Sequence, residues 1–172
     1  MNRVILIKDT GNKAAEKAME SFVRCGDIVY LASGKTLEIP GVRVLDPVSA
    51  AEKIQEKEGK LDILLIGVPE YDGESFVGSK HNYDGILNYI TDCAQSNLQL
   101  VESCLPLLRN GMKRIACITE KESSNSWSAG EKTLAFHQAL AGQNMMGKIL
   151  FNKLRPEGFT FRWYCAGTLP ME

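Results

Sequence analysis

The chain has 172 residues, of which 44% are hydrophobic and 24% are charged. This composition is typical of a globular protein with a packed core, and the length suits one domain better than two. The 20 basic and 21 acidic residues leave a formal net charge of -1, so no overall field attracts nucleic acid or an anionic membrane. We expect neither partner.

The sequence shows neither a targeting pattern nor a metal-binding pattern. Its first apolar run, residues 4–7, is too short for a signal peptide or a membrane span, so we expect a cytoplasmic protein. The five cysteines are widely spaced and form no C-x-x-C pair, which predicts buried free thiols. His81 and His137 lie too far apart to suggest zinc ligands, and we expect no metal site.

Short apolar runs alternate with longer segments of helical periodicity. The predicted strands are residues 4–7, 28–31, 42–45, 61–67, 114–119 and 159–165. The predicted helices are a first one that ends near Gly26, a short one at 49–58, and two long ones at about 83–109 and 132–154. The run 61–67 is almost entirely apolar, as in the middle strand of a parallel sheet buried on both faces. The pattern predicts a three-layer α/β domain whose mostly parallel sheet has about six strands.

Four stretches of the chain have the residue pattern of one enzyme family, in the same order and spacing. They are 4–7 with the Thr10-Gly11 pair, 61–64, 105–109 with 113–115, and 154–158 with 165–168. Together they resemble the short-chain dehydrogenases and reductases across nearly the whole chain. The resemblance implies one Rossmann-like domain over residues 1–172, truncated after the sixth strand, where family members continue into a further helix and a seventh strand.

The catalytic residues of that family are missing from the matching positions. In the family a tyrosine hydroxyl exchanges a proton with the substrate, a lysine four residues later lowers its pKa, and a serine polarises the carbonyl. The tyrosine and lysine positions hold Phe136 and Leu140, the serine position falls near Glu120, and the family's structural asparagine falls near Cys93. We therefore expect no catalytic residue of the usual kind. His137 is the one weak acid–base candidate, and a surface or boundary histidine is its alternative interpretation.

The resemblance also locates the loop that would bind a dinucleotide. Family members have Gly-x-x-x-Gly-x-Gly there, because glycines let the backbone approach the pyrophosphate, whereas residues 9–15 read Asp-Thr-Gly-Asn-Lys-Ala-Ala. We expect NAD or NADP to bind weakly. The candidate contacts are Thr10, Gly11 and Asn12 in this loop, Asp46 after the third strand and Gly67 after the fourth. Thr10 or Asp9 could instead cap the first helix, and Asp46 the helix at 49–58.

Two further features have a plain structural interpretation. Residues 142–148 match Gly-x-x-x-x-Gly-Lys, the start of a P-loop, but lack the following Ser or Thr and lie within a predicted helix. We expect Gly142 and Gly147 to allow close helix packing instead. The charges of Arg3, Lys8 and Lys13 near the first turn are expected to be solvated, since acidic residues intersperse them.

The missing motifs predict a non-catalytic member of this family that acts as a binding or partner subunit. The alternatives are an atypical NAD(P)-dependent oxidoreductase, with His137 or a serine as proton donor, and a domain that binds another nucleotide or a flavin in the same crevice. The two long helices are apolar over more than one stripe, and such helices need cover on more than one side. We expect a homodimer or larger homo-oligomer, with an unidentified protein as a further partner.

Overall fold

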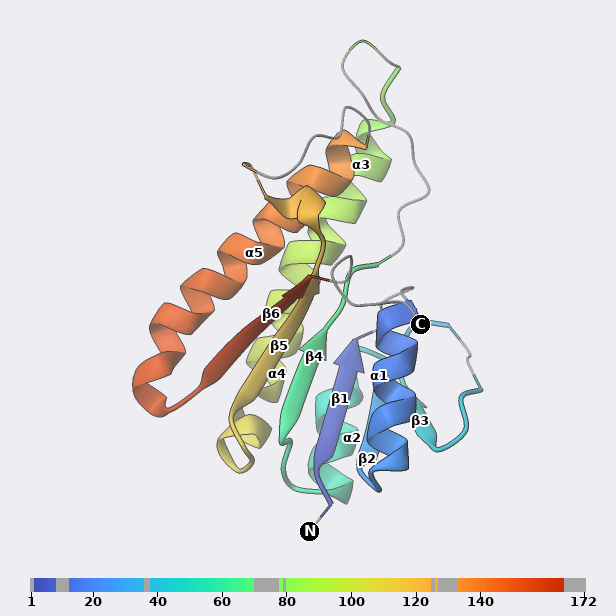
Figure 1. Ribbon diagram of the computed structural model, residues 1–172, viewed down its shortest axis with the longest axis vertical. Helices are drawn as coiled ribbons and strands as arrows, with labels where there is room; N and C mark the ends of the chain where they lie inside the picture. The colour runs from blue at the N-terminus through green and yellow to red at the C-terminus, as the bar shows by residue number, and fades with distance from the viewer. Residues whose placement is uncertain are drawn as a thin grey trace.

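Six strands form one parallel sheet in the computed structural model (Figure 1). The structure describes residues 2–8, 13–35, 38–69, 78, 80–124, 126 and 133–165. The strands are β1 (Val4–Lys8), β2 (Ile28–Ala32), β3 (Val42–Leu45), β4 (Ile63–Ile66), β5 (Arg114–Thr119) and β6 (Thr160–Cys165). The helices are α1 (Lys13–Arg24), α2 (Ala50–Lys57), α3 (Tyr83–Thr91), α4 (Asn97–Arg109) and α5 (Leu134–Leu154). The predicted α/β architecture is confirmed.

The strand order is β3-β2-β1-β4-β5-β6, and neighbouring strands pair in parallel. The order reverses between β1 and β4, because β2 and β3 follow β1 on one side and β4 begins the other half. Strand β4 therefore lies in the middle of the sheet, as its continuous apolar sequence predicts. A reversal of this kind leaves a crevice at the carboxyl ends of the two strands, where α/β proteins bind ligands.

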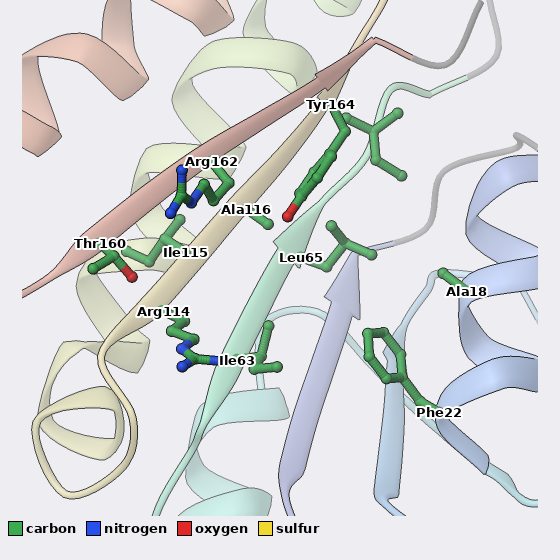
Figure 2. Close-up of a pocket in the computed structure, with 11 residues that line it drawn as sticks. Ala18, Phe22, Ile63, Leu65, Arg114, Ile115, Ala116, Thr160, Arg162 and Tyr164 are labelled. Carbon is green, nitrogen blue, oxygen red and sulfur yellow. The ribbon is translucent and has the colours of Figure 1, made fainter. Parts of the chain in front are cut away.

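Helix α1 packs on one face of the sheet. Strand residues alternate between the two faces, and Ile5 and Ile7 of β1 pack with Ala15 and Met19 of α1. Among the described helices, only α1 contributes to this cluster. Figure 2 shows α1 beside β1, and no other described helix contributes to the cluster on this face of the sheet.

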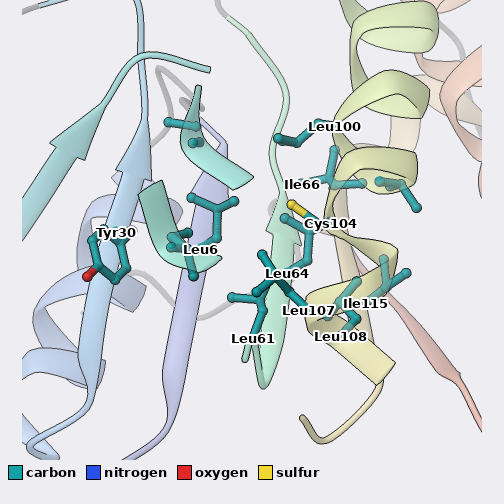
Figure 3. Close-up of a cluster of buried hydrophobic side chains, with 14 of the residues drawn as sticks. Leu6, Tyr30, Leu61, Leu64, Ile66, Leu100, Cys104, Leu107, Leu108 and Ile115 are labelled. Carbon is teal, nitrogen blue, oxygen red and sulfur yellow. The ribbon is translucent and has the colours of Figure 1, made fainter. Parts of the chain in front are cut away.

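The other face carries the larger core, against α2, α4 and α5. Leu6 and Leu64 of the central strands are fully buried there, together with Leu108 of α4 and Ile54 of α2 (Figure 3). The cluster extends to the end of α5 through Leu154. The helices on this face bring the residues that follow β4 and β5 together with α3 and the start of α5.

The long helix predicted at 83–109 is interrupted, so that prediction is wrong in its middle. Between α3 and α4 the chain makes a five-residue π-helical turn, Asp92–Ser96. Asn97 lies directly after it, fully buried, and its side-chain amide donates to the Cys93 carbonyl at 2.6 Å. Side chains that bind the backbone in this way compete with regular helical hydrogen bonding. Wide turns of this kind occur often at functional sites.

Close packing of the two α5 glycines is confirmed for one of them. A Cβ built on Gly147 would lie 2.9 Å from the indole ring of Trp163 in β6. Gly142 has open space where a Cβ would be, so for Gly142 the expectation is wrong. On the same helix, Gly147 and Phe151 contact Trp163 and Phe161 of β6, whereas Gly142 faces away from the neighbouring elements.

The cysteines are all free thiols, but they are not all buried. Cys93, Cys104 and Cys117 are buried, whereas Cys25 is exposed and Cys165 is half-buried. The expectation is wrong for Cys25 because it follows the last residue of α1, where the chain turns at the surface. Within the described ranges, no three metal-ligating side chains come together, and none of the described helices is both long and apolar enough to cross a membrane.

Candidate functional site

The candidate site lies at the carboxyl edge of the sheet, where β1, β4 and β5 end. Strand β4 is followed by Gly67, which is buried, and β5 is followed by Glu120, which is half-buried. Helix α3 and the start of α5 lie over this edge, because α3 packs along α5. The residues that end the central strands therefore share one region with the family's catalytic positions on α5.

The two positions that should carry the catalytic tyrosine and lysine are part of an apolar contact. Leu140 is fully buried. Phe136 is half-buried and stacks on Tyr89 of α3, with ring centroids 6.3 Å apart and planes at 28°. Neither side chain can exchange a proton. At these two positions the structure shows apolar packing.

The stacking places the phenol of Tyr89 next to the position where the family has its catalytic tyrosine. The Tyr89 hydroxyl donates to the Pro69 carbonyl, just after β4, at 2.8 Å. Burial raises the pKa of Tyr89 well above its usual range, and the neighbouring Cys93 and Glu120 raise it further. Tyr89 therefore stays protonated at any physiological pH. Sequence reasoning missed it because it is not followed by a lysine and because its contact with Phe136 joins two separate helices.

Glu120 is the titratable group at the end of β5. Burial raises the pKa of this carboxyl above its ordinary value, and Glu122 adds a smaller electrostatic contribution in the same direction. A carboxyl group in such surroundings keeps its proton to a higher pH than a solvated glutamate does. Perturbed groups of this kind in a ligand-binding region are candidates for acid–base chemistry.

Ser123 follows Glu120 in the chain, and its hydroxyl proton is used in a hydrogen bond. Ser123 donates to the Glu120 carbonyl at 2.7 Å and accepts from the Thr119 hydroxyl at 2.9 Å. These bonds shape the turn of residues 121–123 after β5. A serine as proton donor, one of the alternatives that the sequence leaves open, therefore has less support here than Glu120.

His137 lies beside Phe136 on α5 and is half-buried. Its Nδ1 is 2.9 Å from the Thr133 carbonyl, one helical turn earlier. Because a carbonyl only accepts, Nδ1 carries the proton in this contact. The Nε2 atom is buried and has no hydrogen-bond partner among the described residues. The ring is held to its own helix by this contact. This arrangement is compatible both with a structural role for His137 and with a role in acid–base catalysis.

The candidate cofactor contacts are only partly within the described structure. Thr10, Gly11 and Asn12 lie outside the described residues. Asp46 is exposed, and its Oδ1 accepts from the Val48 backbone at 2.9 Å. The carboxylate thus stabilises the turn before α2, and it does not cap the helix itself. Its other oxygen points to no described partner.

The end of β2 carries a polar turn that the sequence analysis did not single out. Ser33 follows β2 and is buried, and its hydroxyl oxygen accepts from the Lys35 backbone at 3.0 Å. Lys35 itself is exposed. In dinucleotide-binding folds this strand end faces the adenosine ribose, where a carboxylate favours NAD and a cation accommodates the additional phosphate of NADP. Here the strand is followed by Ser33, Gly34 and Lys35, with no carboxylate among them.

Lys8, at the end of β1, is buried rather than solvated, so that expectation is wrong. Its ammonium group lies 3.0 Å from the Asp92 carboxylate and 3.1 Å from the Asp92 carbonyl. Arg3 is likewise paired, with Asp27. The wide turn between α3 and α4 places Asp92 against the end of β1. The contact thus ties the end of β1 to the turn between α3 and α4.

Comparison with known proteins gives the fold. No family model and no curated protein matches the sequence. Among solved structures, a proposed carbonyl reductase, Sniffer of Caenorhabditis elegans, superimposes with a TM-score of 0.81 at 15% identity, over 100% of this chain and 87% of that one. The chain has the short-chain dehydrogenase/reductase fold.

Two further structures with this fold were solved with a nicotinamide dinucleotide. The NADH-dependent reductase A1-R′ in complex with NAD matches with a TM-score of 0.79 at 12% identity, over 94% of this chain and 77% of that one. The NADP complex of Pseudomonas aeruginosa RhlG matches with a TM-score of 0.77 at 16% identity, over 95% of this chain and 71% of that one.

These matches contradict the expectation of a non-catalytic binding subunit. The neighbours that share the fold are described as reductases and dehydrogenases, and some are complexes with NAD or NADP. The inference from Phe136 and Leu140 assumed that acid–base chemistry needs the usual pair. It gave no weight to the protonatable groups that other elements bring to the same region.

Proposed function

We propose that this protein is an atypical NADP-dependent oxidoreductase that interconverts a carbonyl and a hydroxyl group. The observation that carries the proposal is Glu120, a half-buried carboxyl with a raised pKa at the end of β5. It stands where the family resemblance places a polarising serine, and its charge affects Tyr89. Glu120 takes the role of general acid, which a tyrosine has in the family that the chain resembles.

The described residues fit a dinucleotide with a phosphorylated ribose. Lys35 is exposed at the end of β2, and the Ser33 hydroxyl shapes the turn that presents it. Asp46 lies at the end of the neighbouring strand β3, which pairs with β2. The order of strands places β1 and β4, with Gly67, at the point where the sheet reverses. When bound, the nicotinamide supplies or accepts a hydride.

In the direction of reduction, Glu120 donates a proton to the substrate oxygen. The carbon–oxygen π bond breaks as the carbon gains hydride, and its electron pair forms the new O–H bond with the proton of Glu120. The carboxylate that remains takes up a proton from solvent before the next turnover. In oxidation the same group, ionised, accepts the hydroxyl proton. A general acid of this kind typically contributes about 10²–10⁴ in rate.

Tyr89 and Phe136 act as positioning residues. The phenol holds the Pro69 carbonyl, and the stacked ring of Phe136 excludes water from one side of the site. A drier site strengthens the interaction of Glu120 with the substrate oxygen. It also keeps the pKa of Glu120 raised, so that the carboxyl enters the reaction protonated.

The test of this proposal is Glu120→Gln, with Glu122→Gln as the matched control. Glutamine keeps the size and polarity of the side chain but has no acid proton. We expect kcat for reduction to fall by about 10²–10⁴ in Glu120→Gln and by less than about threefold in the control. The wild-type rate should decline as pH rises through the raised pKa of Glu120, since the reduction needs the protonated form.

That alkaline decline should disappear in Glu120→Gln. The same experiment includes His137→Ala, because the histidine is the competing acid. Full activity in Glu120→Gln together with loss of activity in the folded histidine variant would contradict the assignment of Glu120.

We also propose a homo-oligomer. On α5, Met145 and Ile149 are each 61% exposed, and Leu87 on α3 is 62% exposed. Apolar side chains of this size on the surface of neighbouring helices favour association. The five free thiols fit a reducing compartment such as the cytoplasm.

A further inference from the structure

A groove lies on the face of the sheet that carries α1, away from the edge where Glu120 stands. Its volume is about 530 Å³. Ala18 and Phe22 of α1 form one wall, and residues of β4, β5 and β6 form the floor and the opposite wall (Figure 2). Parallel sheets are usually covered on both faces, yet α1 is the only described helix on this one.

The floor of the groove is apolar. Leu65 and Ile118 are largely buried there, while Ile63 and Ala116 remain half-exposed. Two aromatic side chains also line the groove, Phe22 from α1 and Tyr164 from β6, and the Tyr164 ring reaches toward Leu65 (Figure 2). Tyr164 is 51% exposed although it lies against this apolar surface. The groove therefore offers an apolar strip between two rings.

Two arginines of β5 and β6 lie beside this apolar strip. Arg114 pairs with Thr160 in the sheet register and Arg162 pairs with Ala116, so the two arginines lie diagonally across β5 and β6 and on the same face. Figure 2 shows both side chains at the groove. Neither guanidinium makes a hydrogen bond or an ion pair with any residue in the described part of the chain.

Three other arginines of the protein are paired with carboxylates. Arg3 pairs with Asp27, Arg43 with Glu58 and Arg109 with Glu157. Arg24 and Arg155 have no ion pair within the described residues either, but only the groove brings two guanidinium groups together, with no carboxylate among its lining residues. The local charge is positive beside an apolar surface.

We propose that the groove binds a small anionic amphiphile, an aliphatic or aryl chain that ends in one carboxylate. The apolar body would lie on the strip between Phe22 and Tyr164, and the carboxylate would meet Arg114 and Arg162. Guanidinium groups bind carboxylates through paired hydrogen bonds, and the volume falls within the range of about 300–1,000 Å³ of small-molecule sites. This site is separate from the proposed cofactor crevice and does not rest on the proposed function.

The test is calorimetric titration of the protein with decanoate and, as the matched neutral ligand, with decanol, both below the concentration at which they aggregate. We expect decanoate to bind at least roughly tenfold more tightly than decanol, an increment of about 1.4 kcal/mol. Arg114→Gln and Arg162→Gln should each reduce the preference for decanoate. Ala116→Phe, which fills the floor, should weaken both ligands.

The control is Arg155→Gln, which removes the same charge from an arginine that stacks on Phe151 instead. It should leave both affinities unchanged, and circular dichroism should show that all variants are folded. No binding of decanoate to the wild type would overturn the proposal, as would equal binding of decanol. A second copy of the chain could instead cover the groove. In that case decanoate would not bind and Ala116→Phe would convert a dimer to a monomer in light scattering, which would also overturn it.

Discussion

Two residue positions on α5 distinguish this chain from the family that its sequence resembles. Phe136 and Leu140 remove the usual acid and its partner, and they could be identified from the sequence because the flanking strand and helix give the alignment. The roles of the neighbouring Tyr89 and Glu120 could not be identified from the sequence. Tyr89 meets Phe136 only because α3 packs along α5, and the raised pKa of Glu120 depends on burial that no local pattern reveals.

The thiols give a prediction at the same scale. Burial raises the pKa of Cys93 to about 11 and those of Cys104 and Cys117 to about 12. A thiol with so high a pKa has almost no reactive thiolate near neutrality. Cys25 is exposed, so we expect it to react first with a disulfide reagent in the native protein and Cys165 to follow more slowly.

Peptide mapping of the labelled protein by mass spectrometry measures this directly. The three buried thiols should react only when denaturant is added. Labelling of Cys104 or Cys117 as fast as Cys25 under native conditions would contradict the buried placement of α4 and β5.

At the scale of elements, regular segments could be predicted and their interruptions could not. The strands at 42–45 and 114–119 have the predicted bounds, because each is marked by β-branched and other apolar residues in its own sequence. The helix from 83 to 109 was predicted as one piece, since its apolar positions continue across the break. The break depends on Asn97, whose amide binds the Cys93 carbonyl and whose burial is a tertiary effect.

Two glycines should respond differently to replacement by alanine. A Cβ on Gly111, between α4 and β5, would lie 2.0 Å from the Leu61 carbonyl oxygen, which is backbone and cannot move aside cheaply. We expect Gly111→Ala to lower the free energy of unfolding by roughly 1–3 kcal/mol. Gly142 in α5 has no atom within 4 Å of that position, and Gly142→Ala should raise the stability by up to about 1 kcal/mol.

Urea unfolding followed by circular dichroism compares the two variants with the wild type. The difference between the two free energies of unfolding is more informative than either value alone. Both variants replace glycine by alanine, so the difference reports the surroundings of the two positions. Equal stabilities would mean that the turn at Gly111 can relax away from Leu61.

At the scale of the whole molecule, the sheet explains both proposals. The strand order reverses between β1 and β4, where α/β proteins bind ligands, and Glu120 and Tyr89 interact electrostatically near the carboxyl edge of the sheet. The single described helix on the α1 face leaves the groove beside Arg114 and Arg162. The parallel sheet with residues 61–67 in its middle was predicted from the apolar runs and the family resemblance, but the order of its strands was not. The groove was not predicted either, since nothing in a strand's own sequence shows whether a helix covers it.

We propose that this chain transfers hydride with NADPH although it lacks the usual tyrosine and lysine. The most direct measurement incubates the protein with NADPH that carries deuterium at the transferred position and with a panel of aldehydes and ketones, and then analyses the alcohols by mass spectrometry. We predict deuterium in at least one product, faster formation with NADPH than with NADH, and loss of most of that preference in Lys35→Ala. No deuterated alcohol with either cofactor, from protein shown to be folded, would contradict the account.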